Sequence, residues 1–144
     1  MSTDINTLRR LLRLPCTIAV VGLSNEPDRP SYRVARYLQQ HGFRIVPVNP
    51  RYAAAGQSIL GEHCYASLGD IPFAVDMVDV FRRTEDVLPI AEQAVQIGAK
   101  CFWQQIGVEN VAADQLVRAA GLDSVMNLCV KIEHARLLDA GQLH

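Results

Sequence analysis

Residues 18–38 read IAVVGLSNEPDRPSYRVARYL and combine an apolar run, a glycine, a polar loop and a helical pattern. A loop that leads from a strand into a helix often binds phosphate, because the helix N-terminus attracts anions. Gly22 lets the backbone approach a ligand, Ser24 offers a hydroxyl and a backbone N–H, and Ser31 stands where the helix begins. Arg29 adds positive charge. The segment predicts a phosphate site; the alternative is that the glycine serves only the turn and the arginines are solvated.

The glycine pattern of this loop is not that of a dinucleotide-binding loop. Such a loop carries three glycines, whereas none follows Gly22 before Gly42. The second apolar run ends in Asn49, Pro50 and Arg51, where NAD-binding domains place an acid for the ribose hydroxyls. A cation in place of that acid favours a ligand with an extra phosphate on its ribose. NADP and coenzyme A both meet this condition.

The third apolar run, VDMVDVFRR, ends in an aromatic residue and two cations. Phe81 can cover an adenine face or pack under a loop. Arg82 can face a phosphate or pair with Asp79 or Glu85. Asp79 lies inside the apolar run, so in a central strand it requires partners, either backbone N–H groups or an arginine.

The fourth apolar run ends in two amides. Gln104 and Gln105 point to opposite faces of a strand, so one of them is expected to reach a ligand. Gly107 leaves room beside it, and amides suit binding better than proton transfer. We assign Gln104 and Gly107 to the ligand site.

Apolar runs of strand length alternate with helical patterns along the chain. Strands are predicted over residues 17–23, 44–50, 74–81, 100–107 and 123–130, with a short edge strand at 62–65. Helices are predicted over 31–41, 84–97 and 110–120, each followed by a glycine. Near-continuous apolar runs are typical of parallel strands covered on both faces. The pattern predicts an α/β, Rossmann-like, doubly wound and mostly parallel sheet of five or six strands with helices on both faces, whose ligands bind beyond the carboxyl ends of the strands.

Length and composition indicate one domain over residues 1–144, with a helix at 4–14 packing on it. A net charge of −1 provides no field that attracts nucleic acid or an anionic membrane. The apolar runs are too short to span a bilayer. The N-terminus lacks the features of a signal peptide, so we expect a cytoplasmic protein, with a transit peptide as the weaker alternative.

Cysteines and histidines are scattered along the chain. The cysteines stand at 16, 64, 101 and 129 and the histidines at 41, 63, 134 and 144. No two cysteines have the spacing of a redox pair or a zinc knuckle. We therefore expect reduced thiols and no metal site.

Several motifs in the same order carry a resemblance to a known family. They are VVGLS…RPSYRVARYL, VPVNPRY, ILGEHCYASLGDIP, VDMVDVFRR, FWQQIGV and AAGLDSVMNLCVKIEHARL. Over about residues 16–137 the chain resembles the small stand-alone CoA-binding proteins, which are similar to the N-terminal domain of the succinyl-CoA synthetase alpha subunit. The resemblance implies a nucleotide-binding, Rossmann-like domain that holds coenzyme A through its ADP part.

The resemblance also implies roles for the residues at the strand ends. Gly22 and Ser24 approach the pyrophosphate; Asn49, Pro50 and Arg51 border the adenosine and its 3′-phosphate; Phe81 and Arg82 flank adenine or pantetheine; Gln104 to Gly107 border the pantetheine arm. On this view Gly22→Val removes ligand binding and leaves the domain folded. Cys129, at the predicted end of the fifth strand, either meets the ligand thiol or is inert packing.

The resemblance implies a ligand but no reaction, because it does not extend to the synthetase domain that carries the catalytic histidine. The leading interpretation is non-catalytic binding of coenzyme A or acyl-CoA, as a carrier or a sensor. An NADP-linked reductase and an acyl-CoA-processing enzyme are the alternatives. A subunit that docks on a protein partner through its N-terminal helix is a third.

Overall fold

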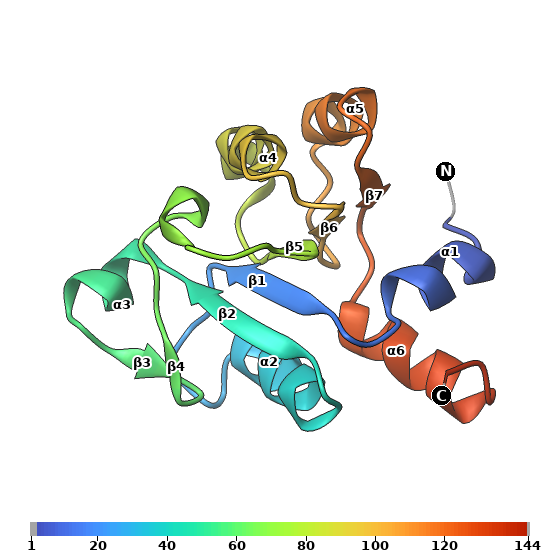
Figure 1. Cartoon of the computed structure of the whole chain (residues 1–144), viewed down its shortest axis with the longest axis horizontal. Helices are drawn as coiled ribbons and strands as arrows, with labels where there is room; N and C mark the ends of the chain where they lie inside the picture. The colour runs from blue at the N-terminus through green and yellow to red at the C-terminus, as the bar shows by residue number, and fades with distance from the viewer. Residues whose placement is uncertain (1–2, 144) are drawn as a thin grey trace.

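A five-stranded parallel sheet forms the centre of the structure (Figure 1), a computed structural model that describes residues 3–143. Its strands are β1 (Thr17–Val21), β2 (Arg44–Val48), β5 (Met77–Val80), β6 (Cys101–Gln104) and β7 (Asp123–Val125), in the order β2-β1-β5-β6-β7. All neighbouring pairs are parallel. Each strand lies inside one of the five predicted apolar runs. The ends of the predicted domain, residues 1, 2 and 144, lie outside the described residues.

Helices cover both faces of the sheet, as predicted (Figure 1). They are α1 (Ile5–Leu11), α2 (Pro30–Gln40), α3 (Pro50–Ala54), α4 (Val87–Gln96), α5 (Val111–Ala119) and α6 (Val130–Asp139), with 3₁₀ turns at Leu68–Asp70 and Thr84–Asp86. Helices α4 and α5 lie on one face, and α2 and α6 lie on the other. The doubly wound α/β fold is therefore confirmed.

Two apolar layers hold the helices to the sheet. On one face Ile18, Val20, Met77 and Trp103 pack against α1, α2 and α6. On the other, alternating strand residues pack against α4 and α5; they include Ala19, Val21, Val78, Val80 and Phe102. Strands with two apolar faces are what near-continuous apolar runs indicate.

All five strands of the main sheet are shorter than predicted, and two predicted strands differ most from the structure. Residues 62–65 do not add a full strand to the main sheet, because the chain turns back at Leu60 and Gly61, and β4 (Glu62–His63) pairs with β3 (Ser58–Ile59). Only Tyr65 forms a bridge to β2. The fifth strand, predicted over 123–130, ends at Val125 because Asn127 adopts a φ of 61° and turns the chain into α6.

Capping residues and prolines explain where several helices begin. Asn110 caps α5 by accepting the N–H of Ala113 at 2.9 Å. Pro89 lies in the first turn of α4, where its missing N–H costs no helical hydrogen bond. The N-terminal helix is shorter than predicted, since Asp4 caps it and the helix ends at Leu11.

The direction of the chain across the sheet reverses between β1 and β5. From β1 the chain moves outward to β2, and then from β5 through β6 to β7 on the other side. At such a reversal the helices that follow the two strands lie on opposite faces, which leaves a crevice beyond the strand ends. The fold thus places a ligand site at the carboxyl ends of β1 and β5.

Candidate functional site

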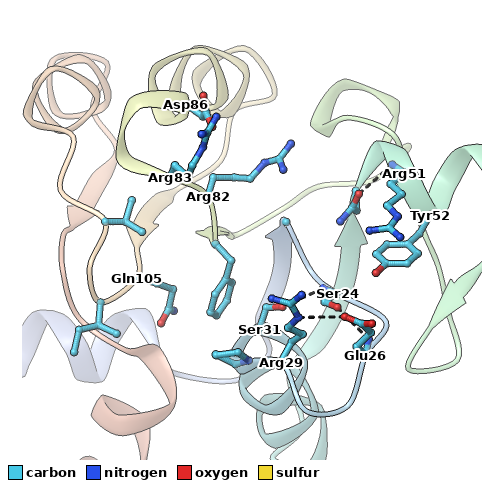
Figure 2. A pocket seen from close by; sticks show the side chains of 16 residues that line it. Ser24, Glu26, Arg29, Ser31, Arg51, Tyr52, Arg82, Arg83, Asp86 and Gln105 are labelled. Atoms are coloured by element: carbon cyan, nitrogen blue, oxygen red, sulfur yellow. Dashed lines mark hydrogen bonds and ion pairs between the residues drawn. The ribbon is translucent and has the colours of Figure 1, made fainter.

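A cleft of about 790 Å³ opens at the carboxyl edge of the sheet (Figure 2). Loops after β1, β2, β5 and β6 line it. Eight of the eleven predicted site residues belong to its wall: Gly22, Ser24, Arg29, Ser31, Asn49, Arg51, Phe81 and Arg82. Pro50, Gln104 and Gly107 do not. Its volume lies in the ordinary range for small-molecule sites.

The N-terminus of α2 points at the cleft without a side-chain cap. Arg29 is its N-cap residue and makes no capping hydrogen bond, and Pro30 follows at the first helical position. The N–H groups of a first turn are an anion site when no side chain satisfies them. Here Ser31, in that first turn, lies in the cleft wall.

The loop after β1 is held by its own serines. The N–H of Ser24 donates to Ser31 Oγ at 3.0 Å, and the N–H of Glu26 donates to Ser24 Oγ at 3.1 Å. The Ser24 N–H, which we expected to face a ligand, is therefore used inside the loop. The Ser31 hydroxyl still has its own proton to donate.

Gly22 sits where the ends of β1 and β5 come together. Its φ is +86°, and a Cβ built on it would lie 2.2 Å from the carbonyl oxygen of Phe81. That neighbour is main chain and cannot rotate away. The glycine is thus required by the close approach of two strand ends, which corrects the expectation that Gly22→Val leaves the domain folded.

Four arginines line the cleft, and two of them have carboxylate partners. Arg29 pairs with Glu26 at 3.1 Å, and Arg83 pairs with Asp86 at 2.9 Å. Within residues 3–143, Arg51 and Arg82 form no ion pair. The cleft consequently offers two uncompensated positive charges, one from α3 and one from the loop after β5 (Figure 2).

Asn49 positions Arg51 and supports the first loop. Its Oδ1 accepts the N–H of Arg51 at 3.0 Å and so caps α3, while its Nδ2 donates to the carbonyl of Leu23 at 3.1 Å. Arg51 then lies with its guanidinium carbon 5.5 Å from the ring centre of Tyr52. Pro50, the exposed first residue of α3, shapes that turn and stays outside the wall.

The two amides after β6 have different surroundings. Gln104 is fully buried; its Nε2 donates to the Asn110 carbonyl at 3.1 Å, and its Oε1 accepts the Asn110 N–H at 2.8 Å. Gln105 lines the cleft instead. The strand alternation was read correctly, but the choice between the two amides placed the wrong one at the cleft. Gly107 also lies outside the wall, where its N–H donates to Asn127 Oδ1 at 2.7 Å.

Asp79 is buried in the middle of β5. Its partner is neither a backbone N–H nor an arginine, but the side-chain amide of Gln105, whose Nε2 donates to Asp79 Oδ1. Burial raises the pKa of Asp79 to about 7, and the hydrogen bond from Gln105 offsets only part of that rise. The carboxyl group is therefore half-titrated near neutral pH.

Eight residues of the wall were not predicted: Glu26, Pro30, Tyr52, Arg83, Asp86, Gln105, Ile106 and Val108. Tyr52 and Arg83 adjoin predicted residues, so taking whole strand-end segments instead of single residues would have included them. Glu26 and Asp86 each stand three residues from the arginine they pair with, so their spacing in the sequence was the signal that could have indicated them.

Other kinds of site are not found in residues 3–143. No group of three histidine, cysteine, aspartate or glutamate side chains is arranged to hold a metal ion. No helix in this part of the chain combines the length and the apolar character needed to cross a membrane.

A protein family and several known proteins match most of the chain. A family described as a CoA binding domain matches residues 16–135. The uncharacterized protein YneT of Bacillus subtilis is 39% identical over 128 residues, which cover 89% of this chain and 92% of that protein. The structure of a hypothetical protein from Pyrococcus horikoshii OT3 is similar, with a TM-score of 0.87, 36% identity and coverage of 96% of this chain and 98% of that one.

Part of a larger enzyme is also similar to this chain. The ADP-forming acetate–CoA ligase II of Archaeoglobus fulgidus is 34% identical over 93 residues. The match covers 63% of this chain but only 13% of the ligase. The similarity therefore concerns one small part of that enzyme.

Proposed function

The chain belongs to the CoA-binding domain family, and from this premise we propose that it binds coenzyme A or an acyl-CoA in the cleft over β1 and β5. The observation that carries the proposal is the charge of the cleft. In the part of the chain that the structure describes, Arg51 and Arg82 have no carboxylate partner, and the uncapped N-terminus of α2 lines the same cleft. The ADP part of coenzyme A carries a pyrophosphate and a 3′-phosphate, which need such donors.

Each part of the ligand has a matching part of the cleft. We assign the pyrophosphate to the N-terminus of α2 and the 3′-phosphate to Arg51. Tyr52 and Phe81 offer aromatic faces for the adenine. The pantetheine arm then runs toward the apolar end of the cleft, where Ile106 and Val108 lie.

The proposed role is binding without catalysis, as a carrier or a sensor of CoA or its thioesters. The hydroxyls of Ser24 and Ser31 accept backbone N–H groups, and no histidine lines the described cleft. Its acids Glu26 and Asp86 pair with arginines. The wall thus holds phosphate donors and lacks a nucleophile paired with a base.

A second candidate is the CoA site of a thioester-forming enzyme that acts with further domains or subunits. The similarity to part of an ADP-forming acetate–CoA ligase favours it. A coupled assay for CoA thioester formation from acetate and ATP, with and without the partner regions of such a ligase, separates this candidate from the carrier.

Calorimetric titration with coenzyme A and dephospho-CoA tests the proposal. Arg51→Ala should weaken coenzyme A binding about tenfold, the lower end for a charge-assisted contact because Arg51 is exposed, and should leave dephospho-CoA binding unchanged. Arg36→Ala is the matched control, since Arg36 is exposed and lies over the Tyr32 ring but is not part of the cleft wall. Equal affinities of the wild type for the two ligands contradict the phosphate assignment.

A further inference from the structure

Two side-chain atoms in residues 3–143 are buried without any hydrogen-bond partner. They are Asp79 Oδ2 and Gln105 Oε1. Both belong to one contact, in which Gln105 Nε2 donates to Asp79 Oδ1. Buried polar atoms in folded proteins are nearly always paired, so two unpaired atoms in one contact require an explanation.

The orientation of the Gln105 amide and the protonation of Asp79 are linked. The oxygen and nitrogen of an amide occupy nearly the same space, so the group can turn over in place. When Asp79 is ionised, the amide N–H donates to the carboxylate and the amide carbonyl takes the free position. When Asp79 is protonated, its O–H donates to the amide carbonyl, and the NH₂ group takes the free position. The remaining Asp79 oxygen is then neutral and costs less to leave unpaired.

Among residues 3–143 no charged side chain bonds to Asp79. Its neighbours across the sheet are Val20 on β1 and Trp103 on β6, both fully buried. The titratable groups of the apolar layer on this face include the thiols of Cys16, Cys64 and Cys101 and the hydroxyls of Tyr32 and Tyr37. Helix α6 adds Lys131, Glu133 and His134. Helix α1 adds Arg9, which donates to the Gln142 carbonyl, and Arg10, which pairs with Asp123.

Most of these groups have partners of their own. Glu133 pairs with Arg136, the Tyr37 hydroxyl bonds to His134 Nδ1, and Lys131 lies over the Tyr37 ring. Burial raises the pKa of the Cys101 thiol well above its usual value, so this group stays neutral. Titration of Asp79 is therefore governed by its burial and by Gln105.

Gln105 connects this buried pair to the ligand cleft. It lines the cleft, and only 2% of its surface is exposed. In Figure 2 it lies apart from the arginines, on the side of the cleft wall formed by the segment after β6. A ligand group that reached its amide would be shielded from water, where a hydrogen bond counts for more.

We propose that Gln105 and Asp79 form a proton-controlled amide in the cleft wall, which offers an N–H donor to a carbonyl oxygen of the ligand when Asp79 is protonated. When Asp79 is ionised, the same position offers a carbonyl and repels that oxygen. The identity of the ligand rests on the proposed function, since the pantetheine arm of coenzyme A carries amide carbonyls.

The pair makes binding depend on pH. Around the midpoint near 7, binding is accompanied by proton uptake at Asp79. At pH 8 the uptake approaches one proton, and the affinity is about tenfold weaker than at pH 6.

Calorimetry at pH 8 in buffers of different ionisation enthalpy measures the uptake. Wild type should take up nearly one proton more than Asp79→Asn, and the phosphates of coenzyme A cancel in this difference. The asparagine amide donates to Gln105 as the protonated acid does, so Asp79→Asn should bind about tenfold more tightly than wild type at pH 8 and equally at pH 6. Asp76→Asn is the matched control: Asp76 pairs with Lys100 at the opposite end of the strand. Equal proton uptake by wild type and Asp79→Asn overturns the proposal.

A second measurement needs neither ligand nor variant. The side-chain NH₂ signals of Gln105 in the NMR spectrum of the free protein should shift with a midpoint near pH 7. Signals that stay flat between pH 5 and pH 9 overturn the proposal, even if Asp79→Asn fails to fold. If coenzyme A fails to bind at any pH, the proposed function is wrong, and the NMR titration alone decides on the buried pair.

Discussion

Replacing Gly22 with alanine tests how the ends of β1 and β5 are joined at the floor of the cleft. The φ of +86° costs an L-residue roughly 1–2 kcal/mol. The added Cβ would lie 2.2 Å from the Phe81 carbonyl oxygen and 3.1 Å from its carbonyl carbon, so two main chains must separate. Overpacking of this kind costs about 1–3 kcal/mol more. We expect Gly22→Ala to lower the free energy of unfolding by roughly 2–5 kcal/mol.

Gly121→Ala is the control for this substitution. Gly121 has a φ of +90°, and nothing lies within 4 Å of its built Cβ, so alanine there costs only the backbone conformation. Urea denaturation of the two variants and the wild type gives the free energies. Gly22→Ala should lose at least about 1 kcal/mol more than Gly121→Ala. Equal losses would refute the contact with Phe81 as the reason for the glycine.

Three further predictions concern buried or partly buried side chains. The pKa of Asp79 in the folded protein, about 7, exceeds its ordinary value of 3.8. The contribution of protonated Asp79 to stability is therefore fully present below pH 3.8 and is lost as the pH rises from there through 7. Urea unfolding should find Asp79→Asn more stable than wild type by up to roughly 4 kcal/mol at pH 8 and equally stable at pH 3.5. Gln104→Leu should cost about 1–3 kcal/mol of stability, because it removes both hydrogen bonds to the Asn110 main chain. The fraction of this variant that is folded should bind coenzyme A with the affinity of the wild type. Cys129 is half-buried, whereas burial raises the pKa of the Cys101 thiol well above its usual value and that of the Cys16 thiol to about 12. A thiol reagent at pH 8 should therefore modify Cys129 first. A first adduct that mass mapping finds on Cys16 or Cys101 contradicts this.

The hydrophobic pattern was sufficient to place the five strands of the main sheet and the helices α2, α4 and α5, but it did not place α3 or α6. Strands buried on both faces leave a clear apolar run, and glycines such as Gly42 and Gly121 end the helices that follow. The pattern failed where a turn decides the path. The positive φ of Asn127 shortens the last strand. Asparagine adopts this conformation more often than other non-glycine residues, but the apolar residues around it favoured a longer strand.

The site could be predicted at the level of loops but not always of side chains. The rule for parallel sheets selects the strand ends, and Arg51 and Arg82 follow from it. It does not say which of two adjacent amides turns to the ligand, because that depends on Asn110, which the fold brings to Gln104. The rule also does not show that the Phe81 main chain occupies the space where a side chain at residue 22 would lie, since this contact depends on the register of β1 and β5.

Binding of coenzyme A is the central claim, and calorimetric titration of the purified chain with coenzyme A and with NADP, followed by backbone amide NMR, tests it most directly. We predict saturable binding of coenzyme A, weaker binding of NADP, and shifts of the amide signals of Gly22, Ser31, Arg51 and Gln105 around the cleft. No saturation with coenzyme A, tighter binding of NADP, or shifts confined to residues away from the cleft would contradict the claim.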